Sequence, residues 1–391
     1  TLPPGFEIRL FASEPEVVNP VAMTWDERGR LFVGMGPQYR NPKPETPGDS
    51  VVIVQDTDGD GRADWKERIL MGLDSADSHH TANAVCLDPA GSIYLSDGVF
   101  HRTQVETAKG PVRNEDGAIY RFEPRTGRFE RYIPYGFANP HGRVFDYWGN
   151  DIITDATGNA NYFGPGFSGH LDAGAHPGYK QFWNRPSRPC PGTAILSSRH
   201  FPDDWQGTFL NTNVITVQGI FRAKITEDGA GIKGETLLPN LIETDKEKAG
   251  NFRPSGVAVA PDGSLYVMDW SQMLIGHLQH HLRDPNRDNQ HGRVYRITYP
   301  ARPLVKPAKV DGATVAELLA NLKEPEYRTR YRTRRELREI RIDLARFNDE
   351  LSNTTKFFGD WHLARIYEKI SSRFHLADWH RTIDGKLKTL D

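Results

Sequence analysis

Short apolar runs separated by polar turns recur along the first 300 residues of the chain. Each unit has a β-like run, a polar turn with a glycine, and a second β-like run. The turn glycines, from Gly29 to Gly263, follow one another at steps of 62, 58, 58 and 56 residues. The five units are VAMTWDERGRLFVGMG (21–36), NAVCLDPAGSIYLSDG (83–98), GRVFDYWGNDIITDATG (142–158), SRHFPDDWQGTFLNTNV (198–214) and SGVAVAPDGSLYVMDW (255–270).

Further strand candidates lie between these hairpins, among them SVVIVQ (50–55), AIYRFEP (118–124) and GIFRAKI (219–225). Four strands in each unit of a regular repeat predict an all-β fold, a β-propeller with five to six four-stranded blades. Five units are visible, and the N-terminal FEIRLFA (6–12) and the last strand RVYRITY (293–299) could close a further blade, so we expect five or six. A β-sandwich is the alternative, but that architecture does not require a fixed repeat length.

The pattern changes after about residue 300, where the predicted propeller (1–300) ends. Residues 301–312 read as a proline-marked linker, and residues 313–391 as a small C-terminal α-helical extension. The first apolar residues there follow helical spacing: Val315, Leu318, Leu319 and Leu322. We expect the basic segment EYRTRYRTRRELRE (326–339) to be a solvated helix face and not a nucleic-acid patch. The pattern is still helical where the chain stops, as in a truncated extension.

Composition narrows the class of protein. The 391-residue chain has a net charge of −2, which favours neither nucleic acid nor an anionic membrane as partner. Cys86 and Cys190 are the only cysteines and lie in no CxxC motif, which excludes a zinc ribbon, a covalent c-type haem and a disulfide scaffold. A single bridge between them stays open. No apolar run has the length of a membrane span and the first residue is threonine, so we interpret the chain as a processed or excised soluble piece.

An acidic segment, DTDGDGRADWKE, occupies residues 56–67. Its acids stand at positions 1, 3, 5, 9 and 12, with glycine at position 6, which is the ligand spacing of a calcium loop. The strand-like flanks predict a calcium-binding β-hairpin loop that braces the fold, and not an EF-hand. A solvated Asp/Gly hairpin is the alternative. The predicted ligands are Asp56, Asp58, Asp60, the carbonyl of Arg62, Asp64 and Glu67.

Polar residues flank the inner hairpins at equivalent points of different repeats. In a propeller such positions surround the central channel, where ligands bind. We therefore expect these residues to converge on one pocket. The set comprises His79, His80, Asn83 and Asp97 around the second hairpin, Asn139, His141, Asp155 and Asn159 around the third, and Arg253 and Asp269 around the fifth.

Several long and unusual strings carry a resemblance to a known family. From about residue 2 to about residue 338 the chain resembles the PVC-type membrane-bound dehydrogenase propellers. That family is similar to the soluble glucose and sorbosone dehydrogenases, which use pyrroloquinoline quinone (PQQ) on a six-bladed propeller. The strings include LPPGFEIRLFASEP (2–15), PVAMTWDERGRLFVGMGPQYRNPKPETPGD (20–49), SDGVFHRTQVET (96–107) and IGHLQHHLRDPNRDNQHGRVYRITY (275–299).

The resemblance implies roles for individual residues. His80 corresponds to the base histidine that takes the substrate's hydroxyl proton while hydride passes to the quinone, and Asp97 would orient it. The string ANPHG (138–142) corresponds to a segment that contacts cofactor and substrate, which assigns Asn139 and His141 to cofactor binding. Arg253 corresponds to an arginine that binds a cofactor carboxylate. This chain departs from the pattern at Ala138, where the relatives have arginine, and lacks their second DTDGDG stretch.

Two classes of function follow. The first is a quinoprotein-type oxidoreductase, a PQQ-dependent sugar dehydrogenase-like enzyme that oxidises a sugar or other alcohol with PQQ and calcium. It would act in the periplasm or as a secreted protein and pass electrons to a separate acceptor, such as a cytochrome or a quinone, because the chain has no haem motif. The second is a non-redox calcium-binding propeller that binds carbohydrate or hydrolyses a lactone. The register of His80 and Arg253 favours the first, and Ala138 favours the second.

Overall fold

The structure is a computed structural model of the 391-residue chain. Most of its described residues before residue 300 are in β-strands, and two α-helices follow. It describes residues 2–25, 30–37, 50–55, 57, 65–70, 73, 83–88, 92–107, 109–123, 126–133, 139–156, 161–163, 181–245, 247, 249–275, 284–288, 290–354 and 369.

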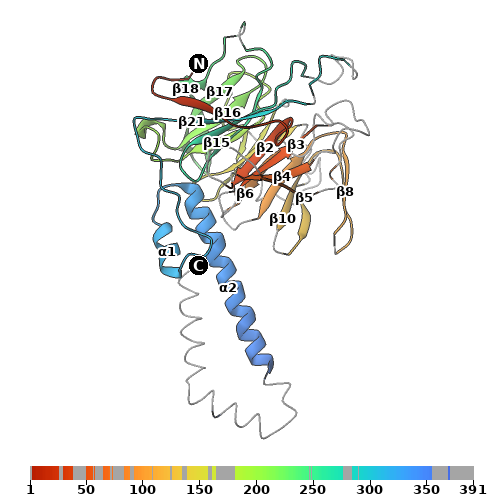
Figure 1. The fold of residues 1–391 in the computed structure, drawn as a ribbon, viewed down its shortest axis with the longest axis vertical. Helices are drawn as coiled ribbons and strands as arrows, with labels where there is room; N and C mark the ends of the chain where they lie inside the picture. The colour runs from red at the N-terminus through yellow and green to blue at the C-terminus, as the bar shows by residue number, and fades with distance from the viewer. Residues whose placement is uncertain are drawn as a thin grey trace.

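Five antiparallel sheets, here called blades 1 to 5 in chain order, make up the β-domain in these residues (Figure 1). Blade 1 contains β2 (Pro20–Trp25), β3 (Leu31–Met35), β4 (Ser50–Gln55) and β5 (Trp65–Leu70). Blade 2 contains β6 (Asn83–Leu87), β7 (Ile93–Asp97), β10 (Ala118–Glu123) and β11 (Arg128–Ile133), with a separate hairpin of β8 (Arg102–Val105) and β9 (Val112–Glu115). Blade 3 contains β12 (Pro140–Phe145), β13 (Asp151–Asp155) and β14 (Asn161–Phe163).

The last two blades contain the remaining strands. Blade 4 contains β15 (Thr193–Leu196), β16 (Thr208–Asn213), β17 (Gly219–Asp228) and β18 (Gly231–Ile242), with a 3-10 turn at Asp203–Trp205. Blade 5 contains β19 (Pro254–Val259), β20 (Leu265–Asp269), β21 (Arg293–Thr298) and, at its edge, β1 (Glu7–Ser13).

The first strands of the five blades form a closed ring. Each of β2, β6, β12, β15 and β19 contacts its two neighbours in this order, and β19 returns to β2. The predicted fold class, a β-propeller with a small helical extension, is therefore confirmed. The structure gives five blades, the lower of the two predicted numbers, in the described residues. The N-terminal and last strands do pair, from Glu7 opposite Thr298 to Ser13 opposite Arg293, but within blade 5 and not as a further blade. The N-terminal strand thus completes blade 5 and covers the edge that β21 would otherwise expose.

The strands nearest the axis are buried on both sides because a blade packs against each face. All six residues of β2, PVAMTW, and all six of β19, PSGVAV, are buried. Such strands appear in the sequence as short continuous apolar runs bounded by turns. This burial leaves the ends of these strands, the residues next to them and the space along the axis as the places where a ligand can bind.

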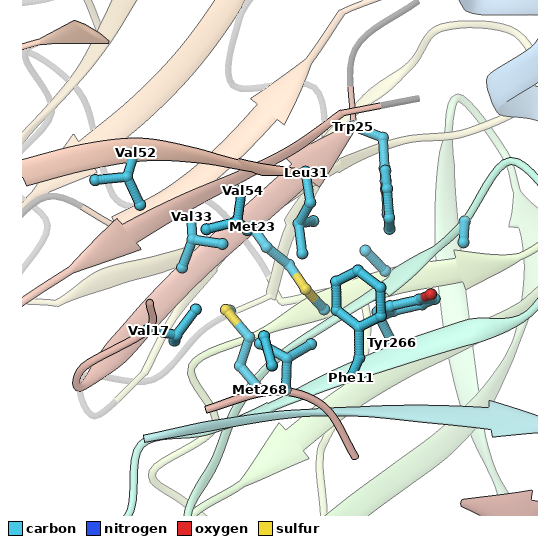
Figure 2. Packing of buried hydrophobic residues seen from close by; sticks show 14 of the residues in the cluster. Phe11, Val17, Met23, Trp25, Leu31, Val33, Val52, Val54, Tyr266 and Met268 are labelled. Atoms are coloured by element: carbon cyan, nitrogen blue, oxygen red, sulfur yellow. The ribbon is translucent and has the colours of Figure 1, made fainter. Parts of the chain in front are cut away.

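Side chains from both ends of the β-domain pack where blade 1 meets blade 5 (Figure 2). The Tyr266 ring lies edge-on to Phe11 and to Trp25, with ring centroids 4.9 and 5.1 Å apart. Met23 and Met268 fill the space beside them, and both are nearly inaccessible to solvent. Aromatic pairs and flexible thioether side chains together fill an irregular gap between the two blades. This contact joins the first blade to the last.

Gly192, just before β15, allows blade 4 to approach blade 5 closely. A Cβ atom there would lie 2.5 Å from the Gly256 Cα and 2.6 Å from the Ser255 carbonyl oxygen. We expect Gly192→Ala to lower the free energy of unfolding by about 1–3 kcal/mol, because backbone atoms cannot move aside. Urea unfolding measures this loss. Gly231→Ala is the control, since its Cβ meets nothing closer than the Asp228 carbonyl at 3.7 Å; equal stability of the two variants would contradict the close approach.

Two helices follow the propeller. α1 (Val315–Asn321) begins with a capping box, in which Thr314 Oγ1 accepts from the Glu317 N–H and the Glu317 carboxylate accepts from the Thr314 N–H. α2 (Tyr327–Thr354) starts at the propeller and then extends away from it (Figure 1). In the described part of the chain, neither helix is both long and apolar enough to cross a membrane.

The start of α2 corrects the expected solvated helix face. Tyr331, Arg332 and Thr333 are buried. Arg328 donates to the Val259 carbonyl at 3.2 Å and to Thr24 Oγ1 at 3.0 Å, so it reaches two of the innermost strands. The basic residues of this segment are therefore divided between solvent and the propeller, a division that charge alone does not reveal.

Candidate functional site

Three adjoining cavities follow the propeller axis between the innermost strands. The upper cavity, of about 40 Å³, includes Asn139, His141, Ser255 and Trp270 in its wall. The middle cavity shares His141 and Ser255 with it. The basal cavity, of about 60 Å³, shares Arg143 and other residues with the middle one and ends against the start of α2. The axis is thus lined by polar residues at both ends.

Asn139 and His141, both predicted from the sequence, come together in the upper cavity. His141 lies in β12, and Asn139 directly precedes that strand. The Asn139 N–H donates to Asp155 Oδ2 at 3.0 Å, and its carbonyl accepts from the Ala156 N–H at 2.7 Å. These bonds hold the backbone of Asn139 to the next strand, so the residue is placed at the mouth of the channel by its own blade.

Arg253 occupies the corresponding position in blade 5, directly before β19. Its N–H donates to Asp269 Oδ1 at 2.9 Å, and its guanidinium donates to the Met273 carbonyl at 3.1 Å. Its Nε is buried and has no hydrogen-bond partner among the described residues. Burial lowers the pKa of Arg253, and the nearby Asp269 carboxylate opposes this effect. A guanidinium in this state has lost water and gains from binding an anion.

An aspartate at the end of the second strand recurs in three blades and positions the backbone. Asp155 and Asp269 are buried and hold the N–H groups of Asn139 and Arg253, respectively. Burial raises the pKa of Asp269, whereas bonds from the N–H groups of Arg253 and Ser271 lower it. These two carboxylates therefore act on the site through the residues that they hold.

Asp97 is the third member of this set. Its carboxylate is buried and accepts from Thr103 Oγ1 at 2.6 Å, from the Tyr120 hydroxyl at 3.0 Å and from the Ala118 N–H at 3.2 Å. These bonds tie Asp97 into blade 2, and it does not line the upper cavity. His79 and His80 lie outside the described residues, so the orientation of His80 by Asp97 stays a prediction.

The predicted calcium loop falls between β4 and β5. These strands pair antiparallel, with Gln55 opposite Trp65, so the flanks are strands as predicted for a hairpin loop. Asp56, Asp58, Asp60, Arg62 and Asp64 lie outside the described residues, and Glu67 lies within β5, opposite Ile53. Among the residues that the structure describes, no group of His, Cys, Asp and Glu side chains is arranged to hold a metal ion. Calcium binding stays a prediction.

Three residues of this region were not predicted. Ser255 donates its hydroxyl to the Pro20 carbonyl at 2.7 Å, and Trp270 forms an apolar wall of the upper cavity. Trp270 directly follows Asp269, so its place after the second strand was a usable signal. Arg185 donates to the carbonyls of Asp155 and Ala156 at 2.7 and 3.0 Å. It comes from a segment without strands, in which no sequence pattern marks it.

The two cysteines are separate. Cys86 and Cys190 are free and buried, so the single bridge left open by the sequence is not formed. Burial raises the pKa of each thiol to about 11. Both are therefore neutral thiols at physiological pH and serve as small apolar side chains.

One family of known proteins matches most of the chain. The profile of a family described as "Domain of unknown function (DUF7133)" matches residues 1–65, 49–168 and 179–301. Among curated proteins, none matches the chain.

Solved structures provide more distant similarities. The PQQ domain of pyranose dehydrogenase from Coprinopsis cinerea is 12% identical, with 76% of this chain and 96% of that chain covered and a TM-score of 0.42. The soluble aldose sugar dehydrogenase from Escherichia coli is 12% identical, with coverage of 75% and 99% and a TM-score of 0.41. A gluconolactonase from Xanthomonas campestris is 13% identical, with coverage of 73% and 72% and a TM-score of 0.36.

Proposed function

Since the chain belongs to the family described as Domain of unknown function (DUF7133), we propose its function from the residues at the upper end of the channel. The protein is a quinoprotein-type oxidoreductase that oxidises a sugar or other alcohol with PQQ and calcium. The proposal joins the resemblance to the PVC-type dehydrogenase propellers with the position of Arg253, Asn139 and His141. A periplasmic or secreted location and a separate electron acceptor belong to the same proposal.

The proposal depends mainly on the environment of Arg253. PQQ is a planar quinone with carboxylate groups, and a carboxylate is the preferred partner of a guanidinium. The Arg253 Nε is buried without a partner among the described residues, and burial lowers the pKa of the side chain. Binding of an anionic group would supply the missing acceptor. These residues therefore fit one carboxylate of the cofactor.

The upper cavity, of about 40 Å³, is too small to enclose the rings of PQQ, so the remainder of the ligand would lie across its mouth. Trp270, Val214 and Ile275 are apolar walls suited to a planar ring, and Asn139 and His141 add polar groups. When bound, PQQ accepts the two electrons that leave the alcohol carbon as hydride. His80 accepts the hydroxyl proton in the same oxidation, and the substrate becomes a carbonyl compound. Calcium in the loop 56–67 braces the fold.

Titration with PQQ in the presence of calcium tests this proposal, with binding followed by quinone absorbance and turnover by dye reduction over a panel of sugars. We expect saturable binding and substrate-dependent dye reduction. Arg253→Met should weaken PQQ binding by about 10–100-fold, the value of a charge-assisted hydrogen bond. Arg131→Met, an exposed change in blade 2, is the control. Equal affinities of the two variants would contradict the role of Arg253, and no binding by the unmodified protein would contradict the oxidoreductase.

The alternative is a non-redox propeller that binds carbohydrate or hydrolyses a lactone. The wall of the upper cavity favours it in one respect, because an amide, a hydroxyl and an indole ring from Asn139, Ser255 and Trp270 also suit a sugar. Glycan binding or lactone hydrolysis without PQQ binding would establish this alternative. Under this alternative, neither the unmodified protein nor Arg253→Met would reduce the dye.

Calcium binding has a test of its own. We expect the unmodified protein to melt at a higher temperature in calcium than in chelator, since a bound ion at 100 times its Kd stabilises by about 2.7 kcal/mol. Asp58→Ala combined with Asp60→Ala should abolish the difference, because two ligand carboxylates are lost. Asp228→Ala, an exposed change at the end of β17, should retain it. An unchanged calcium response of the double variant would contradict the predicted loop.

A further inference from the structure

The basal cavity lies at the opposite end of the channel from the proposed quinone site. The start of α2 closes it, with Tyr327, Arg328 and Tyr331 in its wall. Arg143 and Thr193, from β12 and β15, line the same space. Its volume of about 60 Å³ is room for more than one water-sized group.

Arg328 brings a positive charge to this cavity. Its guanidinium donates to the Val259 carbonyl and to Thr24 Oγ1, and both partners are neutral. Among the described residues, Arg328 forms no ion pair. Its desolvation lowers its pKa. A desolvated cation whose partners are all neutral costs free energy, and a bound anion offsets that cost.

Arg143 adds a second guanidinium. Its side chain is 1% exposed, and Nη2 donates to Asp151 Oδ2 at 2.8 Å. Its Nε and Nη1 atoms are buried and have no hydrogen-bond partner within the described residues. The Thr193 and Tyr331 hydroxyls, in the wall of the same cavity, are also buried without one. Unsatisfied donors and hydroxyls from three separate elements thus surround one small space.

Charge decides what this space accepts. Two guanidiniums line the cavity, and the Asp151 carboxylate forms an ion pair with Arg143. Asp88 lines a neighbouring cavity together with Arg328, but its carboxylate accepts from the Ser92 N–H and the Tyr94 hydroxyl, and Arg328 has no ion pair among the described residues. Water would satisfy the hydrogen bonds but would leave the second charge uncompensated. A cation would be repelled. An anion satisfies both the donors and the charge.

We propose that the basal cavity is a binding site for a small inorganic anion of about the size of chloride, held between Arg328 and Arg143. The anion would join α2 to the innermost strands, because Arg328 comes from the helix and Arg143 from β12. It is independent of the proposed quinone site, which lies at the other end of the channel. Binding of the anion would hold α2 against the propeller and so raise the stability of the protein.

The test measures thermal melting of the full chain at increasing chloride, with the ionic strength held constant by sodium isethionate, whose anion is too large for the cavity. We expect a saturable rise of about 2–4 °C in melting temperature. Arg328→Met should abolish it, and Arg334→Met, which removes an exposed arginine of the same helix, should retain it. Bromide should give an anomalous scattering peak between the two guanidiniums in crystals.

Thr193→Val provides a second variant in case Arg328→Met fails to fold. It removes one hydroxyl from the wall with little change in shape, so the chloride midpoint should rise by about 5–10-fold while the melting temperature without chloride changes little. A chloride response that is absent in the unmodified protein, or equal in Arg328→Met, Thr193→Val and Arg334→Met, would overturn the proposal. Bromide bound elsewhere and absent from this cavity would do the same.

Discussion

The His80→Ala variant is expected to oxidise sugars about 10²–10⁴-fold more slowly in the dye-linked assay, with its melting temperature and PQQ affinity unchanged. The reason is chemical: hydride leaves the alcohol carbon only as its hydroxyl proton is removed, and alanine has no group that accepts a proton. Initial rates at saturating PQQ and calcium measure the effect. This expectation rests on the proposed function.

His291→Ala is the matched control for that experiment. His291 is another histidine of the propeller, and its ring lies 2.7 Å from Asp288 Oδ2 and is partly exposed to solvent. It has no part in the proposed chemistry, so its loss should leave the rate unchanged. Full turnover in His80→Ala would show that another group is the base, while PQQ binding could still be sound.

The Arg143→Met variant is expected to lose about 3–5 kcal/mol of unfolding free energy, because it leaves the Asp151 carboxylate buried without its cation. The two side chains are 1% and 8% exposed, and the Arg143 guanidinium also lies 4.2 Å above the centre of the Tyr94 ring. Methionine keeps the apolar part of the side chain and removes the charge. Urea unfolding at fixed chloride measures the loss.

The Arg102–Glu115 ion pair provides the control, since the distance between its paired atoms is nearly the same but its side chains are exposed to solvent. Its atoms are 2.9 Å apart, but the side chains are 80% and 68% exposed. Arg102→Met should therefore cost at most about 1 kcal/mol. Arg143→Met with Asp151→Leu should recover most of the stability, because no charge is left buried. Similar losses in Arg143→Met and Arg102→Met would contradict the importance of burial.

The fold was predictable where the signals are local. The turn glycines and apolar runs that mark each hairpin lie within about fifteen residues of one another, so the repeat appears directly in the sequence. The pairing of the first and last strands was also expected from their pattern, but their blade was not. Which sheet edge takes β1 depends on how the ring closes, and ring closure leaves no mark on the pattern of β1 itself.

The candidate site was likewise predictable only where the signals are local. Asn139, His141 and Arg253 were found because each stands directly before an inner strand, a position that the hairpin pattern reveals. Arg185 was missed because it reaches the carbonyls of Asp155 and Ala156 from a segment without strands. The expected solvated face of residues 326–339 was wrong for a related reason. Helical spacing reports which side chains share a face, and not what that face contacts.

By itself, the sequence determined the repeating hairpins, the β-propeller class, the helical extension and the residues next to the inner strands, because backbone preferences and side-chain alternation act over short distances. Only the tertiary structure decided that β1 completes blade 5 and that Arg328 reaches Thr24, which lies 304 residues earlier in the chain. Contacts of that kind depend on the final packing of whole blades.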